Sequence, residues 1–311
     1  LHLTNRRQRQ MCIRDRENPH QSATWYQRGI NASGWGTSKI LQGKELSYNN
    51  LVDLEAARRI ITEFSDAPTV AILKHTNPCG VAVDETLLGA YEAALAGDSV
   101  SAFGGIVALN KSIDAPTATA MTKTFLECVV APGCEPEAEE IFQKKSKLRV
   151  LISPDLNQGE SETIKVIAGG FLAQDADNGV DNSSDWKIVT EKKPTTEQME
   201  ELMFAWKVVK HVKSNAIVVT KNRATIGIGA GQMNRVGAVK IALEQAGEKA
   251  IGSVLASDAF FPFDDSVKTA AAAGATAIIQ PGGSLKDKDS IAAANQLGLV
   301  MIFTGIRHFL H

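Results

Sequence analysis

SAFGGIVALNKSIDAPTATAMTKTFLECVV, residues 101–130, decides the fold class. An apolar run over 106–109 predicts a strand, the pattern over 116–125 predicts a helix, and a second apolar run over 128–130 predicts another strand. Strands that alternate with helices are typical of α/β layering and not of a helical bundle or a β-sandwich. We therefore expect an α/β protein.

The same alternation continues on both sides of this stretch. Further strands are predicted over 69–73, 217–220, 253–256, 277–279 and 299–302. Further helices are predicted over 51–64, 86–96, 196–212, 235–245, 266–273 and 286–296.

The composition excludes several classes of protein. Of 311 residues, 44% are hydrophobic, which suffices for one large core or two cores of about 150 residues each. Lys and Arg number 33 against 35 Asp and Glu, with no basic stripe, so no nucleic-acid partner is expected. The apolar runs are too short to span a membrane. Four cysteines without a CxxC pair favour a reducing cytoplasm and argue against a cysteine-rich zinc site.

Composition also suggests the domain organisation. Residues 174–194 are rich in Asp, Asn, Ser and Lys and predict a connection over 176–194. Domains are then expected over 17–175 and 195–311. Residues 1–16 are basic and lack apolar periodicity, so we interpret them as a foreign or disordered segment.

Three short motifs recur in the same order and predict an internal duplication. LKHTN at Leu73 is echoed by VKHVKSN at Val209, and SAFGG at Ser101 by SDAFFPF at Ser257. VVAPG at Val129 is echoed by IIQPGG at Ile278. We expect two related α/β halves.

Lys74 and His75 follow a predicted strand and precede a turn-forming Thr-Asn-Pro-Cys-Gly sequence. Ligands bind at strand ends in open α/β sheets. A lysine could stabilise developing negative charge there, and an imidazole could transfer a proton. Taken alone, the dipeptide also fits an ordinary surface lysine beside a hydrogen-bonded histidine.

The run IGIGAGQMNR, residues 226–235, precedes a predicted helix. Backbone N–H groups at the helix start, together with Arg235, could bind a phosphate. The glycine spacing differs from the dinucleotide-binding GxGxxG fingerprint, which disfavours a nicotinamide dehydrogenase. A glycine-rich turn without a ligand is the alternative.

SDAFFPFDD, residues 257–265, concentrates aromatic residues in a chain with 6% aromatics. It could form an aromatic wall for a flat heterocycle. A core plug at a strand-to-loop junction is the alternative.

Taken together, an ordered set of motifs resembles the 5-aminoimidazole-4-carboxamide ribonucleotide (AICAR) formyltransferase domain of the bifunctional purine biosynthesis proteins. The motifs are ENPHQ, LQGKELSYNNLVD, ILKHTNPCG, SAFGG, VVAPG, VKSNAI, GIGAGQMNR, SDAFFPFDD and RHFLH. The resemblance covers residues 17–311. It implies two cytidine-deaminase-like subdomains, and zinc is not expected because neither HxE nor PCxxC is present.

The resemblance also implies roles for individual residues. Lys74, His75 and His311 match the catalytic positions. Asp258 matches an acid associated with a potassium ion in some members. The positions that match nucleotide or folate contacts are Asn50, Gly104, Asn215, Arg235, Arg307, Phe260, Pro262 and Phe263.

The implied activity is formyl transfer from 10-formyltetrahydrofolate to the amino group of AICAR in purine biosynthesis, by a homodimer with shared active sites. An inosine monophosphate (IMP) cyclohydrolase domain precedes this domain in the family, and we expect this sequence to lack it. The family pattern Arg-Tyr-Gly before ENPHQ is replaced by Arg14, Asp15 and Arg16, which puts nucleotide binding by that loop in doubt. A non-catalytic nucleotide-binding remnant is therefore the alternative.

Overall fold

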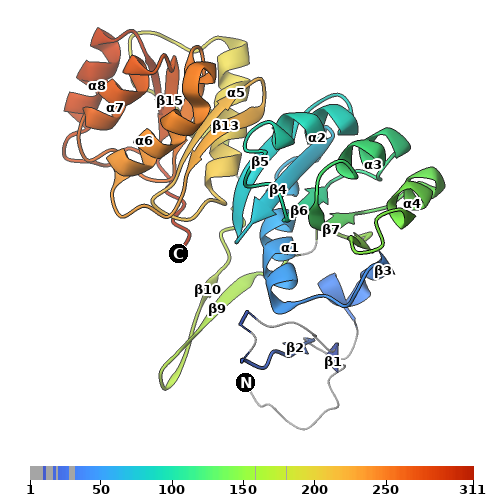
Figure 1. Ribbon diagram of the computed structural model, residues 1–311. Helices are drawn as coiled ribbons and strands as arrows, with labels where there is room; N and C mark the ends of the chain where they lie inside the picture. Colours follow the sequence, from blue (N-terminus) through green and yellow to red (C-terminus); the bar gives the residue numbers. More distant parts are fainter. Residues whose placement is uncertain (1–9, 12–16, 19, 28–31, 158, 180) are drawn as a thin grey trace. The chain divides into compact units, whose positions relative to one another are not determined.

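A computed structural model describes residues 10–11, 17–18, 20–27, 32–157, 159–179 and 181–311. The chain divides into two compact units. The first unit comprises residues 1–95 and 99–158, and the second comprises residues 96–98 and 159–311. Figure 1 shows strands and helices alternating in both units.

The first unit is built around a mixed sheet with the strand order β5-β4-β6-β7-β8-β3. Its strands are β3 (Lys39–Gln42), β4 (Thr69–Lys74), β5 (Asn77–Val83), β6 (Gly105–Leu109), β7 (Leu126–Ala131) and β8 (Arg149–Ile152). Its helices are α1 (Tyr48–Ile61), α2 (Leu87–Leu95), α3 (Ala115–Met121) and α4 (Pro136–Gln143). A short 3-10 helix (Gly34–Thr37) precedes β3, and the two-residue strands β1 (Gln10–Met11) and β2 (Trp25–Tyr26) pair with each other.

The second unit has a mixed sheet with the order β11-β16-β15-β14-β12-β13. Its strands are β11 (Lys187–Ile188), β12 (Ile217–Lys221), β13 (Ala224–Gly229), β14 (Val254–Ser257), β15 (Ala277–Gln280) and β16 (Val300–Phe303). Its helices are α5 (Thr196–Val209), α6 (Arg235–Ala246), α7 (Asp265–Ala272) and α8 (Asp287–Gln296), and short 3-10 turns cover Ser183–Asp185 and Gly247–Ala250. In Figure 1, α5 covers one face of this sheet, and α6, α7 and α8 cover the opposite face.

The two units share one topology. In each, a hairpin (β4–β5 or β12–β13) is followed by an antiparallel neighbour of its first strand and then by two parallel strands. A short antiparallel strand, β3 or β11, closes the far edge in each unit. The predicted α/β class is confirmed.

Local signals explain where the elements begin. Ser47 and Asn50 form a reciprocal capping box at α1, and Thr195 and Gln198 do the same at α5, so the first N–H groups of both helices have partners. Asp114 caps α3 by accepting a hydrogen bond from the Thr117 N–H. The central strands are buried over nearly their whole length, which is why they stand out in the sequence as continuous apolar runs.

All the predicted strands and helices are present, with shifts of a few residues at their ends. Several strands were not predicted, among them β3, β5, β8, β13 and β11, the last of which lies within the predicted connection. Residues 77–83, which begin with the expected Asn-Pro turn, form β5, and the first four residues of the glycine run belong to β13.

Two of the three sequence echoes are wrong as repeats. Lys74 ends β4, whereas VKHVKSN begins at Val209, the last residue of α5. The position equivalent to Lys74 is Lys221, at the end of β12. SAFGG precedes β6, whereas SDAFFPF follows β14. The VVAPG and IIQPGG motifs do lie at equivalent strand ends, those of β7 and β15.

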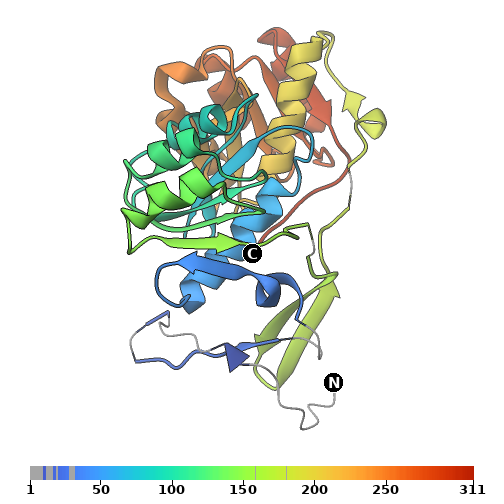
Figure 2. The ribbon, with the colours of Figure 1, turned by 90° about the vertical axis from the view of Figure 1, so that its right-hand side faces the viewer.

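Residues 162–175 form a separate antiparallel hairpin of β9 (Glu162–Ile167) and β10 (Gly170–Asp175). Figures 1 and 2 show it as a long ribbon, and among the described residues its two strands pair only with each other. Contact between residues divides the chain after residue 158, ahead of the connection predicted over 176–194, so this hairpin belongs to the second unit. Across the described ranges of the chain, no helix is long and apolar enough to cross a membrane.

Candidate active site

The turn between β4 and β5 presents Lys74 and His75. His75 and Thr76 both have left-handed backbone conformations, with φ of 54° and 64°, which matches the tight two-residue turn of the hairpin. The Lys74 ammonium donates a hydrogen bond to the Phe103 carbonyl oxygen at 2.9 Å. The turn therefore has a defined shape, with a cation directly before the imidazole.

Asp53 on α1 contacts this turn and holds it in place. Its Oδ1 accepts a hydrogen bond from the Thr76 N–H at 2.6 Å. Burial raises the pKa of the Asp53 carboxyl, although the Thr76 hydrogen bond and the nearby charge of His75 act in the opposite direction. Asp53 was not predicted as a site residue, because only its spacing from Asn50 on one helix indicates in the sequence that it faces the same strand end.

Gly104 and Asn50 complete the predicted residues of the first unit. Gly104 has a φ of 74°, which glycine adopts without strain, and its N–H donates to the Phe125 carbonyl at 2.8 Å. Asn50 is buried, and its Oδ1 accepts from the Ser47 N–H in the helix cap. The cap gives Asn50 a structural role, and its nucleotide contact stays a prediction.

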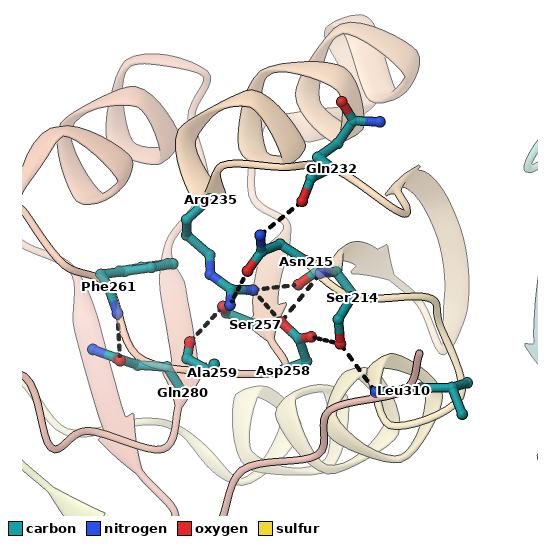
Figure 3. A network of polar contacts seen from close by, with 11 residues as sticks. Ser214, Asn215, Gln232, Arg235, Ser257, Asp258, Ala259, Phe261, Gln280 and Leu310 are labelled. Carbon is teal, nitrogen blue, oxygen red and sulfur yellow. Dashed lines mark hydrogen bonds and ion pairs between the residues drawn. The ribbon is translucent and has the colours of Figure 1, made fainter. Parts of the chain in front are cut away.

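Asn215, Arg235 and Asp258 lie together in the second unit (Figure 3). The Arg235 guanidinium pairs with Asp258 Oδ1 and donates to Asn215 Oδ1 at 2.7 Å. Ser214 Oγ donates to Asp258 Oδ2 at 2.6 Å. Asn215 Nδ2 donates to the Gln232 carbonyl at 2.7 Å, so both ends of its amide have partners.

The sequence predicts that Arg235 binds a phosphate, whereas in this network its charge is paired with Asp258. The side chain is only 6% exposed and its guanidinium also donates to the Ala216 carbonyl at 3.3 Å. An arginine whose charge is paired with a buried carboxylate holds neighbouring groups in place more readily than it attracts a solvent anion. Its nucleotide contact stays a prediction, and its contacts support the orientation of Asn215.

Two of the three glycines of the 226–235 run, Gly227 and Gly229, allow close packing between strand and helix. A Cβ atom at Gly227 would overlap the Ala242 carbonyl oxygen of α6, and one at Gly229 would overlap that of Ala238. Gly80 of β5 has the equivalent relation to Ala94 of α2. These close approaches explain the spacing of Gly227 and Gly229 without any ligand.

The aromatic loop after β14 combines both interpretations made from its sequence. Phe261 is fully buried in the core of the second unit, and its N–H donates to Gln280 Oε1 at 3.1 Å. Phe260 and Phe263 are exposed, and Pro262 is partly exposed. The loop is thus anchored by one phenylalanine and leaves two available for a ligand.

The exposed side chains of Arg307, Phe309 and His311 lie next to one another in the C-terminal segment. The Arg307 guanidinium lies 4.8 Å from the centre of the Phe309 ring, and the rings of Phe309 and His311 lie 5.6 Å apart. Between them, His308 is buried and contacts Asp177 and Asp181. His308 was missed in the sequence, where only its place inside the RHFLH motif gave a signal.

The remaining predictions concern metals and the N-terminal loop. Within the part of the chain that the structure describes, no group of three or more His, Cys, Asp and Glu side chains is arranged to hold a metal ion. Arg14, Asp15 and Arg16 lie outside the described residues.

Comparison with known proteins gives one family. The family model described as "AICARFT/IMPCHase bienzyme" matches residues 2–245, a range that includes most of the segment expected to lie outside the family. The bifunctional purine biosynthesis protein PurH of Trichodesmium erythraeum is 88% identical over 299 residues, and that of Rippkaea orientalis is 71% identical over 300 residues. Each alignment covers 96% of this chain and 58% of the relative, so the chain spans less than two thirds of their length.

Proposed function

The chain belongs to the AICARFT/IMPCHase bienzyme family, and on that premise we propose that it transfers a formyl group from 10-formyltetrahydrofolate to the amino group of AICAR. The observation that carries the proposal is the fixed β4–β5 turn, in which Lys74 donates to the Phe103 carbonyl and Asp53 holds Thr76 beside His75. The products are formyl-AICAR and tetrahydrofolate.

The chemistry requires both groups of this turn. The amino group of the nucleotide is a weak nucleophile because its lone pair is conjugated with the ring and the carboxamide. As its nitrogen attacks the formyl carbon, His75 accepts the amine proton and Lys74 stabilises the oxyanion. The bond from carbon to the folate nitrogen then breaks, and that nitrogen takes up a proton.

A formyl-transfer assay on the purified 311-residue chain tests the proposal. With AICAR and 10-formyltetrahydrofolate, we expect equimolar formyl-AICAR and tetrahydrofolate. Nucleotide binding by calorimetry without product would instead identify a non-catalytic nucleotide-binding remnant. Absence of both binding and product would contradict the family assignment of function as a whole.

A duplication of one cytidine-deaminase-like unit is part of the proposal. Its support is the common strand order of the two units, together with equivalent glycines at Gly80 and Gly227 that admit a close helix. The subdomain limits of 17–175 and 195–311 stay proposals beside the division after residue 158.

The potassium ion implied by the resemblance fits poorly with the contacts of Asp258. Asp258 Oδ1 accepts from Arg235 and from the Ala216 N–H, and Oδ2 accepts from Ser214. A cation would have to compete with the guanidinium for this carboxylate. No step of the proposed reaction therefore involves potassium.

We also propose that the chain forms a homodimer and that the β9–β10 hairpin contributes to the interface. Cross-strand pairing places Ile164, Val166, Phe171 and Ala173 on one face of the hairpin, and all four are exposed. An isolated hairpin is marginally stable in water, and an exposed apolar face of this kind is typical of an interaction surface. A second copy would cover it.

The dimer proposal predicts the effect of a charge on this face. Val166→Asp with Phe171→Asp should convert the dimer to a monomer in multi-angle light scattering, because two carboxylates would be buried without partners. Lys165→Asp, on the other face of the same hairpin, is the matched control and should remain dimeric. A double variant that stays dimeric at micromolar concentration would exclude the hairpin from the interface.

A further inference from the structure

The C-terminal segment 304–311 belongs to the second unit, and its burial alternates from Arg307 onward. Arg307, Phe309 and His311 are exposed, whereas His308 is buried and Leu310 is partly buried. The His308 N–H donates to the Asp258 carbonyl at 3.0 Å. The Leu310 N–H donates to Ser214 Oγ at 3.0 Å, and its carbonyl accepts from the Ser214 N–H at 2.9 Å (Figure 3).

His308 adds the side-chain anchor of this segment. Its Nδ1 lies 2.6 Å from Asp177 Oδ2 and its Nε2 lies 2.9 Å from Asp181 Oδ2. Because the two carboxylates lie on opposite nitrogens of the ring, they clamp the imidazole and do not converge on a shared ion. The imidazole ring centre also lies 5.1 Å from that of Trp206 on α5.

The aspartates are themselves held in place. Trp206 Nε1 donates to Asp181 Oδ2 at 2.6 Å, and Lys210 Nζ donates to the Gly179 carbonyl at 3.2 Å. The segment that carries Asp177 and Asp181 is therefore fastened to α5 independently of the tail. The charge of Lys210 also acts on both carboxylates, and that of His211 acts on Asp177.

We propose that His308 is a positioning residue, which fastens the C-terminal segment between Asp177 and Asp181 and thereby sets the places of Arg307 and His311. This inference rests on the proposed formyl transfer for the roles of Arg307 and His311. The clamp fixes the backbone between these two residues, whose side chains are exposed. A displacement of about 1 Å in a reacting group can cost as much as a hundredfold in rate.

The charge state of His308 gives the clamp a pH dependence. Burial by itself would lower the pKa of His308, but the hydrogen bonds and charges of Asp177 and Asp181 outweigh it and raise the pKa to about 9. Because this value lies above the ordinary 6.5, the stabilisation by His308 is complete below pH 6.5 and is lost as the pH rises through about 9.

The pKa values of Asp177 and Asp181 determine at which low pH the same clamp is lost. The hydrogen bond from His308 lowers the pKa of Asp177. Burial raises the pKa of Asp181, but hydrogen bonds from His308 and Trp206 outweigh it and lower the pKa. Their stabilisation is present above the ordinary value of 3.8 and is lost only as the pH falls through the lowered values.

Two variants test the proposal from opposite sides: His308→Gln, and the double variant Asp177→Asn with Asp181→Asn. Asp185→Asn, an exposed aspartate of the same connecting segment, is the matched control. At pH 7.5 we expect faster hydrogen exchange of the 304–311 peptide in both test variants. The turnover number should fall by about ten- to a hundredfold, and the control should resemble the wild type.

The pH profile separates positioning from a general loss of stability. Formyl transfer by the wild type should decline as the pH rises through about 9. In the double aspartate variant this decline should move to lower pH, since the histidine loses the partners that raise its pKa. His308→Gln should lack this titration.

The outcomes also separate this inference from the proposed function. Unchanged exchange of the tail peptide in both variants would overturn the clamp, whatever the activity. Faster exchange with wild-type turnover would overturn the positioning role. A wild-type chain without formyl transfer would refute the proposed function, and calorimetry with AICAR would then decide whether the clamp positions Arg307 for binding. If His308→Gln fails to fold, the double aspartate variant decides alone, because its changes lie on partly solvent-accessible side chains.

Discussion

Replacement of Lys74 or His75 by alanine is expected to lower the single-turnover rate of formyl transfer by about 10²- to 10⁴-fold. Both residues act on charges that develop during the reaction, so their loss should reduce the turnover number and leave nucleotide binding largely intact. The measurement is product formation in a single turnover at saturating AICAR and 10-formyltetrahydrofolate, with nucleotide affinity determined by calorimetry.

Lys111→Ala is the matched control for Lys74→Ala. Lys111 is an exposed lysine of the first unit that, like Lys74, donates to a backbone carbonyl, in its case that of Ser65 at 3.1 Å. Its loss should leave the rate unchanged. Asp53→Asn should cause an intermediate decrease, because Asp53 holds the turn through the Thr76 N–H. Wild-type single-turnover rates in both Lys74→Ala and His75→Ala would show that the catalytic assignment is wrong.

The elements that the sequence predicts correctly are those with a continuous apolar signal. β4, β6 and β12 are buried on both faces, so each appears as a run of apolar residues. β5 was not predicted as a strand because it begins with Asn-Pro, which is typical of a turn. Pro78 pairs with Leu73 where the register of β4 and β5 shifts, an irregularity at which a strand tolerates proline.

β13 was not predicted as a strand for a different physical reason, which is its glycine content. Glycines usually mark turns, and the sequence alone does not distinguish this use from close packing. Here Gly227 and Gly229 admit the carbonyl groups of α6 against the strand. Gly80 meets the same need for close packing, in its case against the Ala94 carbonyl group of α2.

The sequence marks Lys74 and His75 as candidates, but it does not mark the residues that hold the C-terminal part of the candidate site in place. Lys74 and His75 stand out because they end an apolar strand. Asp177, by contrast, is 131 positions from His308 in the sequence and lies in a polar stretch that resembles a simple connection. Sequence gives no sign of such a pairing, since each residue alone fits an ordinary surface role.

Arg235→Ala is expected to lower the free energy of unfolding by about 3–5 kcal/mol, which is the usual cost of removing one partner of a buried ion pair. Asp258 is fully buried, and without the guanidinium its carboxylate would keep only hydrogen bonds from Ser214 and the Ala216 N–H. Asn215 Oδ1 would lose its partner as well. Urea unfolding followed by circular dichroism measures the loss.

Two further variants decide whether the buried charge causes this loss. Lys240→Ala removes an exposed cation from the same helix, α6, and should change the free energy of unfolding by no more than about 0.5 kcal/mol. Arg235→Met combined with Asp258→Asn removes both charges, and should cost less than the sum of the two single changes because no charge remains buried alone. If Arg235→Ala is no more destabilising than Lys240→Ala while it weakens AICAR binding strongly, the guanidinium turns outward to the nucleotide, and the paired arrangement with Asp258 does not persist in solution.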